Sequence, residues 1–270
     1  MSIMINRPEN WISLFPQPSV DGHKYHRGHA ALLGVPELTG ATRLAAEACS
    51  RIGAGLVSVL SDDAGDIYRM TLPADIMVKP LEALASPRVT VLLAGSGGLS
   101  QTTKNALLNA PPDLPKVLDA EAISLFGRLT ARELVLTPHD GEFGRAFADL
   151  EGDRKSIAVA AAKRANAVLL LKGPETVIAA PDDRVVINTH ASPYLAKAGT
   201  GDVLAGMITG LIAQGMPGFE AAAAAVWMHG HASLKIGPGL IAQDLIAALP
   251  DVLSDLLETP DGADRIIKEE

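Results

Sequence analysis

Val168-Leu169-Leu170-Leu171 is a run of four apolar residues, and Lys172-Gly173-Pro174-Glu175-Thr176 follows it directly. A strand with one face in water alternates apolar and polar residues, whereas this run has no polar face. It therefore predicts a strand that is buried on both sides, as in a parallel sheet with helices on both faces. The polar pentapeptide would then lie at the carboxyl edge of that sheet.

Runs of the same kind alternate along the chain with longer segments of helical period, which predicts an α/β fold with a mainly parallel central sheet. We expect strands at 30–33, 56–60, 89–94, 117–119, 134–136 and 168–171. We expect helices at 41–52, 102–108, 157–165, 203–213, 221–234 and 244–257. The segments 176–180 and 185–188, joined by Pro181-Asp182-Asp183-Arg184, predict an antiparallel hairpin at one edge of the sheet.

Composition narrows the possible functions. The 270 residues carry 23 Lys and Arg against 31 Asp and Glu, a net charge of −8, and 48% are hydrophobic. The apolar content excludes a disordered chain, and the absence of any basic run argues against nucleic-acid or membrane-surface binding. The single cysteine, Cys49, excludes an internal disulfide, and neither a signal peptide nor an apolar membrane span is present. We therefore expect a cytoplasmic protein.

Both ends differ in composition from the middle of the chain. Residues 6–28 are polar and rich in proline, and residues 260–270 are charged. We expect an N-terminal extension at 1–22, one domain at 23–258 and a charged tail at 259–270. No internal repeat is found.

Gly199-Thr200-Gly201-Asp202 opens the apolar run 203–208. The start of a helix presents unpaired backbone N–H groups, and glycines let an oxyanion approach them closely. The motif therefore predicts a phosphate or anion site. Taken alone, it is equally consistent with a structural role in which Asp202 only caps the helix.

Three further polar segments follow predicted strands. Thr137-Pro138-His139-Asp140-Gly141-Glu142 comes after 134–136, where open α/β sheets bind their ligands. His139 and Glu142 would share one face of a starting helix, where the imidazole can contact a substrate and the carboxylate can hold a hydrated magnesium ion. The alternative is a helix cap in which Glu142 favours the positive end of the dipole. The other two are Lys172 to Thr176 and Gly95-Ser96-Gly97-Gly98-Leu99.

Histidines at 23, 26 and 29 and at 229 and 231 raise the question of a zinc site. No carboxylate or cysteine stands at a recognised ligand spacing, so we do not expect zinc. Gly28 and Gly230 between them indicate close backbone approach instead. No nucleophile elbow, Walker A sequence or intact dinucleotide-binding glycine motif is present.

The order of these motifs is that of one known family. The chain resembles the ADP-dependent NAD(P)H-hydrate dehydratases of the ribokinase-like superfamily from about His23 to Pro250. The resemblance rests on His23 to Ala30, Gly40-Ala41, Arg51 to Val57, Leu118-Asp119-Ala120, Leu136 to Phe143, Leu171-Lys172-Gly173 and Gly199 to Gly206. It differs from the usual family pattern at Gly95 to Leu99, at Ser124, at Asp140 and at Asn188 to Pro193.

The resemblance implies a ribokinase-like fold and repair of nicotinamide cofactors that have taken up water at the reduced ring. ADP would phosphorylate the new hydroxyl group, and expulsion of phosphate would restore NADH or NADPH, leaving AMP. By resemblance Asp202 is the catalytic general base, and Ala41, Gly97, His139, Asp119 and Asp202 bind the substrate. Lys172, Gly173, Pro174, Glu175, Thr176, Gly199, Thr200 and Gly201 would bind the nucleotide. Glu142 would bind Mg²⁺ through water.

Alternatives remain at this point. A ribokinase-like kinase for a vitamin precursor would use the same Gly-x-Gly-Asp motif, although such kinases usually carry Asn where this chain has His139. A degenerate adenylate-binding subunit is the second alternative, and the intact Asp202 argues against it. Relatives often carry an epimerase domain, so we expect functional pairing with an NAD(P)H-hydrate epimerase, either separate or in a longer protein. The apolar segment 221–234 and the resemblance lead us to expect a homo-oligomer, commonly a tetramer.

Overall fold

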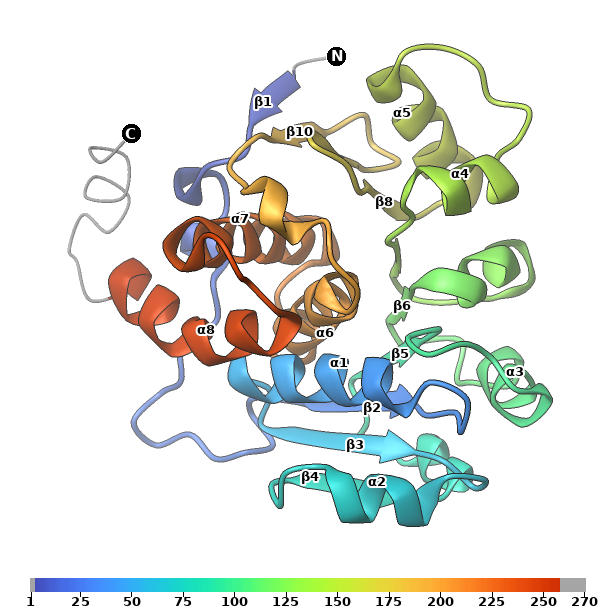
Figure 1. Ribbon diagram of the computed structural model, residues 1–270. Coiled ribbons are helices and arrows are strands. Elements are labelled where there is room, and N and C mark those ends of the chain that lie inside the picture. Colours follow the sequence, from blue (N-terminus) through green and yellow to red (C-terminus); the bar gives the residue numbers. More distant parts are fainter. Residues whose placement is uncertain (1–2, 258–270) are drawn as a thin grey trace.

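The computed structural model describes residues 3–257, which fold around one ten-stranded sheet (Figure 1). The strand order is β1-β10-β9-β8-β7-β6-β5-β2-β3-β4. The strands are β1 (Ile3–Ile5), β2 (His29–Leu33), β3 (Leu56–Leu60), β4 (Ile76–Lys79), β5 (Val91–Ala94), β6 (Lys116–Leu118), β7 (Leu134–Leu136), β8 (Val168–Leu171), β9 (Thr176–Ala179) and β10 (Val185–Asn188). All neighbours from β4 to β8 are parallel, so the expected α/β fold with a mainly parallel sheet is confirmed.

The expected hairpin is formed by β9 and β10, which pair antiparallel with Val185 opposite Ala179. Asp183 adopts a left-handed conformation (φ 70°) in the turn between them. The hairpin does not end the sheet, however, because β1 pairs parallel with β10 on its outer side. Three residues between polar and proline-rich neighbours gave no recognisable strand pattern in the sequence.

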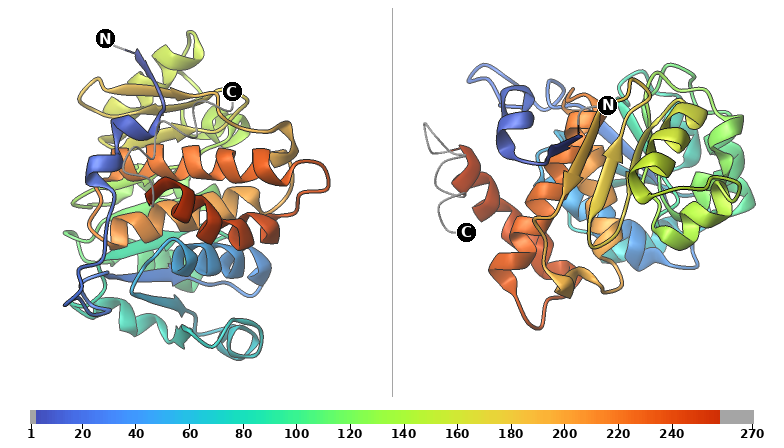
Figure 2. Two further views of the ribbon diagram at one scale, coloured as in Figure 1. Left: turned by 90° about the vertical axis from the view of Figure 1, so that its left-hand side faces the viewer. Right: turned by 90° about the horizontal axis from the view of Figure 1, so that it is seen from above.

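Helices cover both faces of the sheet, as Figure 2 shows from above. One core lies under α1, α6, α7 and α8, and a second lies under α3, α4, α5 and a 3₁₀ segment, η4. The helices are α1 (Thr39–Arg51), α2 (Gly65–Thr71), α3 (Gln101–Leu108), α4 (Asp140–Ala146), α5 (Arg154–Ala165), α6 (Thr200–Ala213), α7 (Gly218–Ile236) and α8 (Ala242–Leu257). The 3₁₀ segments are η1 (Pro8–Asn10), η2 (Ile12–Leu14), η3 (Leu81–Ala85), η4 (Ala120–Arg128) and η5 (Pro193–Leu195).

Alternate residues of each strand serve the two cores. Ala30 and Leu32 of β2 belong to the first core, whereas Ala31 and Leu33 belong to the second. A strand of this kind needs apolar residues at every position, which is the uniform pattern seen in the sequence.

The described part of the expected N-terminal extension packs on the domain. Trp11 is fully buried in the first core, and its indole Nε1 donates to Asn6 Oδ1. The side-chain Nδ2 of Asn6 donates to Asn188 Oδ1 at 2.9 Å and to the Ala223 carbonyl at 2.7 Å. Residues 3–15 are therefore part of the folded unit rather than an appendage to it. The expected tail at 259–270 lies outside the described residues.

The helix α6 lies very close to α1. A Cβ placed on Gly206 would be 2.1 Å from the Ala45 carbonyl oxygen, and one on Gly210 would be 2.7 Å from that of Cys49. Only glycine permits this approach, which fixes the N-terminus of α6 over the N-terminal half of α1. Among the described helices, none is both long and apolar enough to span a bilayer.

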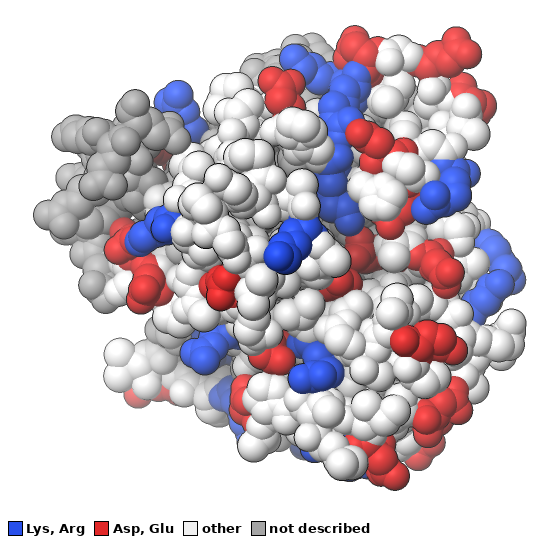
Figure 3. All heavy atoms as spheres, viewed as in Figure 1, with Lys and Arg blue, Asp and Glu red and all other residues white. Residues whose placement is uncertain are grey.

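The helix α7 is buried by the chain's own elements. Its neighbours include α6, α8, β9 and η1, and most of its residues are buried. The apolar character of 221–234 therefore does not argue for an oligomer, because the subunit itself covers the helix. On the face seen in Figure 3, acidic and basic side chains are interspersed, with one narrow column of Lys and Arg.

Candidate active site

The strand order reverses between β2 and β5. From β2 the chain proceeds outward through β3 and β4, and then returns to pair β5 with the other side of β2. The helix and loop that follow these two strands diverge at such a point and leave a crevice at the carboxyl edge, where α/β sheets bind ligands. Here the crevice is flanked by the start of α1, with Ala41, and by the loop Gly95–Gly98.

This loop is held in place by backbone contacts that require glycine. Gly97 has φ of 94°, and a Cβ there would lie 2.7 Å from the Leu38 carbonyl oxygen. The Thr42 hydroxyl donates to the Ser96 carbonyl at 2.8 Å. Gly97 is thereby brought against the start of α1, close to Ala41, as the two predicted substrate-binding positions require.

Lys172 joins two carboxylates at the carboxyl edge. Its Nζ lies 3.1 Å from Asp119 Oδ1, at the end of β6, and 3.9 Å from Glu142 Oε2 on α4. Asp119 is buried and also accepts a 2.7 Å hydrogen bond from the Thr137 hydroxyl. A Cβ on Gly201 would lie only 3.4 Å from the same Nζ. Lys172 therefore links the ends of β6 and β8 to the start of α6.

His139 caps α4 and is tied to Glu142. The His139 backbone N–H donates to Glu142 Oε2, and His139 Nδ1 accepts from the Gly141 and Glu142 amides. The helix-cap alternative for this pair is thus present in the structure. The imidazole is still about half exposed (55%), so it remains accessible to a ligand in the crevice.

The N-terminus of α6 offers backbone donors. Among the described residues, the amides of Gly201 and Asp202 have no acceptor. The Thr200 hydroxyl donates to the carbonyls of Leu195 and Lys197, and the Thr200 amide also donates to the Lys197 carbonyl at 3.4 Å, so the free donors are those of Gly201 and Asp202. Unpaired amides at the start of a 14-residue helix form a favourable anion site.

Asp202 lies at this helix start with an altered acidity. Burial raises the pKa of its carboxyl group to about 6, and the nearby Asp119 and Glu142 add to the rise. Lys172 and the Ser96 hydroxyl act in the opposite direction. Ser96 Oγ is buried and has no hydrogen-bond partner of ordinary length in the described part of the chain. Asp202 is thus a carboxylate at neutral pH that readily accepts a proton.

The loop 172–176 is held by a residue that the sequence did not single out. Arg154 at the start of α5 donates to the carbonyls of Leu171, Lys172 and Glu175, and its Nη1 lies 2.5 Å from Asp140 Oδ1. The structure therefore brings Lys172 to Thr176 to the same edge as the start of α6.

His229, on α7, was considered in the sequence only as a possible zinc ligand, and the structure gives it a different role. Burial lowers the pKa of its imidazole to about 4, so the ring is neutral, and Nε2 donates to the Thr200 carbonyl at 3.0 Å. It positions the glycine-rich turn before α6. Because this contact joins residues 29 positions apart, no local sequence pattern predicts it.

The remaining histidines lie in separate places, and only His190 and His231 share a hydrogen bond, with His190 Nε2 3.2 Å from His231 Nδ1 in the part of the chain that the structure describes. His29 is buried and bonds the Ser58 hydroxyl, whereas His23 and His26 stack on each other at the surface. His231 stacks on Trp227. Within the described residues, no group of three or more His, Cys, Asp and Glu side chains is arranged to hold a metal ion.

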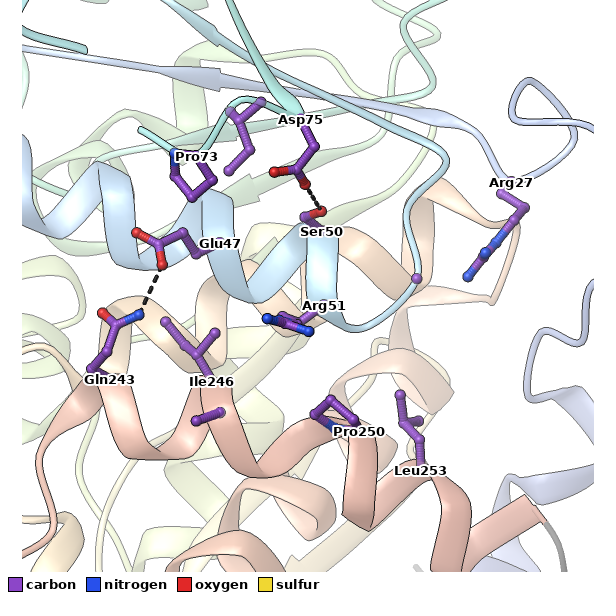
Figure 4. A pocket seen from close by; sticks show the side chains of 13 residues that line it. Arg27, Glu47, Ser50, Arg51, Pro73, Asp75, Gln243, Ile246, Pro250 and Leu253 are labelled. Atoms are coloured by element: carbon purple, nitrogen blue, oxygen red, sulfur yellow. Dashed lines mark hydrogen bonds between the residues drawn. The ribbon is translucent and has the colours of Figure 1, made fainter. Parts of the chain in front are cut away.

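A cavity of about 650 Å³ lies away from this site, at the far end of α1 (Figure 4). Two of its polar pairs are already satisfied: Gln243 Nε2 donates to Glu47, and the Ser50 hydroxyl donates to Asp75, each at 2.8 Å. Ile246 of α8 adds an apolar wall. None of the predicted site residues lines this cavity.

The sheet order, the glycine loop at the strand-order reversal and the Gly-x-Gly-Asp helix define a ribokinase-like α/β protein, and solved structures of that class have the same fold. Residues 30–256 match the model of one family within it, described as NAD(P)H-hydrate dehydratase. The chain belongs to this family.

Individual relatives agree with that assignment. The chain is 33% identical to the ADP-dependent (S)-NAD(P)H-hydrate dehydratase of Neisseria meningitidis, over 87% of this chain and 88% of that protein. It is 37% identical to the bifunctional NAD(P)H-hydrate repair enzyme of Moorella thermoacetica, over 91% of this chain but 53% of the relative. The chain thus spans about half the length of such bifunctional relatives.

A solved structure supports the same family. The ADP/ATP-dependent NAD(P)H-hydrate dehydratase of Bacillus subtilis, co-crystallized with ATP and Mg²⁺, superposes with a TM-score of 0.81. It is 28% identical, and the match covers 94% of this chain and 99% of that one.

Proposed function

We propose that this protein is a hydro-lyase that uses ADP to dehydrate the S epimer of hydrated NADH and NADPH. The proposal is carried by Asp202, a carboxylate with a raised pKa at a helix start whose amides are unpaired, beside Lys172. The family assignment and the relative from Neisseria meningitidis support the substrate and the donor.

The reaction proceeds in two steps. The substrate hydroxyl group attacks the terminal phosphorus of ADP, its proton passes to Asp202, and AMP leaves. The ring nitrogen then expels the new phosphate ester as inorganic phosphate, and a proton is lost from the neighbouring ring carbon. The conjugated dihydropyridine is thereby restored, and phosphate replaces hydroxide as the leaving group.

The roles of this chain's residues follow from charge and position. Asp202 accepts the hydroxyl proton as phosphorus is attacked. The amides at the start of α6 and the Lys172 ammonium group stabilise the negative charge on the transferring phosphoryl group. Gly173 to Thr176 line the nucleotide side. Ala41, Gly97 and His139 would hold the hydrated nicotinamide, with Asp119 fixing Lys172.

Magnesium is part of the proposal. Mg²⁺ usually binds one or two carboxylates together with substrate phosphates and keeps several waters. Glu142 and Asp119 provide carboxylates near Lys172, and no cage of three ligands exists in the described residues, which fits an ion that is shared with the nucleotide. Glu142 would hold such an ion through water. The ion would neutralise charge on the phosphates.

The test follows recovery of the dihydronicotinamide absorbance from hydrated NADH in the presence of protein, Mg²⁺ and either ADP or ATP, with AMP measured in parallel. We expect recovery with ADP, faster than with ATP at matched Mg²⁺. Accumulation of a stable phosphate ester on an added vitamin-precursor alcohol, without recovery from the hydrate, would favour the kinase alternative. Adenylate binding without either reaction would favour the degenerate subunit.

The cellular setting is also proposed. We expect a cytoplasmic homo-oligomer, commonly a tetramer in this family, that works with an NAD(P)H-hydrate epimerase. The bifunctional names of half-matching relatives support that pairing. Light scattering at micromolar concentration tests the oligomer, and a monomeric mass would contradict it.

A further inference from the structure

A second cavity, of about 550 Å³, opens beside the proposed catalytic centre. It lies between α3, η4 and α4, and Glu142 belongs both to its wall and to the centre described above. Leu99 follows the Gly97 loop, and Ala120 follows Asp119, so the cavity begins where the predicted substrate residues end. Its size is within the range of small-molecule sites.

The acidic side chains of this cavity have hydrogen-bond partners, whereas its basic side chains do not. Its acids are engaged: Glu121 Oε2 accepts the Leu99 amide at 3.1 Å, and Glu142 Oε2 accepts the His139 amide at 2.9 Å. Its two cations are Lys104 on α3 and Arg145 on α4. In the part of the chain that the structure describes, neither of these side chains has a hydrogen bond or an ion pair.

The rest of the lining suits a nucleoside. Leu99, Ala120 and Ala146 are partly exposed and form the apolar part of the lining, above the buried Ile123 and Leu125 of η4. An apolar surface with a few polar groups at its rim is the usual lining of a small-molecule site. A ligand with a flat base and an anionic group matches both parts.

We infer that this cavity binds the adenosine half of the hydrated dinucleotide, and that Lys104 and Arg145 bind the 2′-phosphate that distinguishes NADPH from NADH. The inference rests on the proposed function. With the nucleotide donor on the side of Gly173 to Thr176 and the nicotinamide near Gly97, the other half of the substrate has this cavity beside it. Two cations without partners suit a phosphate dianion.

The kinetic test compares hydrated NADPH with hydrated NADH in the wild type and in the double variant Lys104→Ala, Arg145→Ala. We expect the KM for hydrated NADPH to rise about 10- to 100-fold, because two charge-assisted contacts are lost. The KM for hydrated NADH should change less than about threefold, and kcat should stay the same for both. Arg128→Ala, an exposed cation of η4 outside the cavity, is the matched control.

A binding test does not depend on turnover. With the donor site saturated by AMP, calorimetry should show that adenosine 2′,5′-bisphosphate binds the wild type and Arg128→Ala, but about tenfold or more weakly to the double variant. If the wild type binds the bisphosphate but shows no dehydratase activity, and the double variant loses that binding, the cavity assignment is supported and only the proposed function is overturned. Equal binding by wild type and double variant, or equal KM changes for both hydrates, would overturn the inference.

Discussion

Lys116 and Lys172 are both largely shielded from water, but they lie at opposite edges of the sheet. Lys116 begins β6 at the amino edge, and its Nζ donates to the carbonyls of Pro111, Leu114 and Thr130 at 2.7–3.1 Å. Lys172 follows β8 at the carboxyl edge, and its Nζ faces the carboxylates of Asp119 and Glu142. One lysine is held by neutral acceptors and the other by charges.

The difference separates stability from chemistry. Burial lowers the pKa of Lys116 to about 8, and its three carbonyl partners cannot change their charge. Such an ammonium group connects loops through all three of its N–H donors, so no donor remains for a ligand. The partners of Lys172 are ionisable, and the unpaired amides of α6 lie beside it. Polar groups at the amino edge thus hold the fold, whereas those at the carboxyl edge remain available to a substrate.

Removal of the proposed base should have the largest effect. Asp202→Asn keeps a helix-capping side chain, so nucleotide binding should survive, but general-base loss should lower kcat by about 10² to 10⁴. The measurements are AMP affinity by calorimetry and ADP-dependent recovery of NADH from its hydrate. Asp66→Asn, in the exposed first turn of α2, is the control and should keep full activity. Dehydration by Asp202→Asn within about threefold of wild type would exclude the role of base.

Lys172→Met should lower kcat by about 10² to 10³, because one stabilising cation for the phosphoryl group is lost. The buried Asp119 carboxylate keeps the hydrogen bond from Thr137 but loses its ammonium partner, so the free energy of unfolding should also fall, by about 1–3 kcal/mol. Lys155→Met, a cation of α5 whose ammonium group has no ion pair in the described residues, is the matched control. A large loss of stability with normal kcat would show that Lys172, like Lys116, serves the fold rather than the reaction.

Lys116→Met should show the opposite pattern. Three carbonyls, of which that of Leu114 is buried, lose their donor, so the free energy of unfolding should fall by about 2–4 kcal/mol, while kcat of the folded protein stays the same. Urea unfolding at pH 7 measures this change, with the exposed Lys235→Met as control. An unchanged urea midpoint would show that the buried amine does not stabilise the fold.

The acidity of Asp202 gives opposite pH trends for activity and stability. Because the base must be ionised, kcat/KM should fall about tenfold per pH unit below pH 6. Its folded pKa of about 6 exceeds the usual 3.8, so the folded state binds more protons between these values and stability falls as pH rises through them. Asp202→Asn should therefore be more stable than wild type by about 1–3 kcal/mol at pH 8, and equally stable near pH 3.5. Thermal unfolding at both pH values tests this, and an equal difference at both would refute the assigned pKa.

His229 should have the smallest effect, because it acts through the backbone. His229→Gln retains a donor for the Thr200 carbonyl and should lose less than about fivefold in kcat/KM, whereas His229→Ala should lose about tenfold. Rescue by Gln relative to Ala, at equal folding, is the decisive comparison. Equal losses would indicate that the volume of the ring matters rather than its hydrogen bond.

Uniform apolar runs made much of the sheet predictable. The strands 56–60, 134–136 and 168–171 were predicted to the residue, because a strand buried on both faces has a clear local pattern. The short elements β4 and α2 were missed, since four and seven residues carry too little periodicity.

The site was predictable wherever a glycine or a charge follows a strand. Lys172, His139 and the Gly-x-Gly-Asp motif of α6 lie together at the carboxyl edge, although their individual roles remain predictions. Arg154 was not foreseen, and His229 was considered only as a zinc ligand. Their contacts join segments that are adjacent only after folding, and an arginine or histidine on a helix has many ordinary uses.

The pairing of β1 with β10 sets the order in which the sheet can be completed. Ile3 lies opposite Val185, and Asn6 bonds the carbonyl of Ala223, more than 200 residues further along the chain. At ribosomal rates of about 5–20 residues per second, the first strand waits about 10–40 s for its partners to be synthesised. Until then β1 has no strand to pair with, and the indole of Trp11 has no complete core to enter. The N-terminal segment is therefore the last part to join the sheet. While β1 is unpaired, the nascent chain is prone to wrong strand pairing.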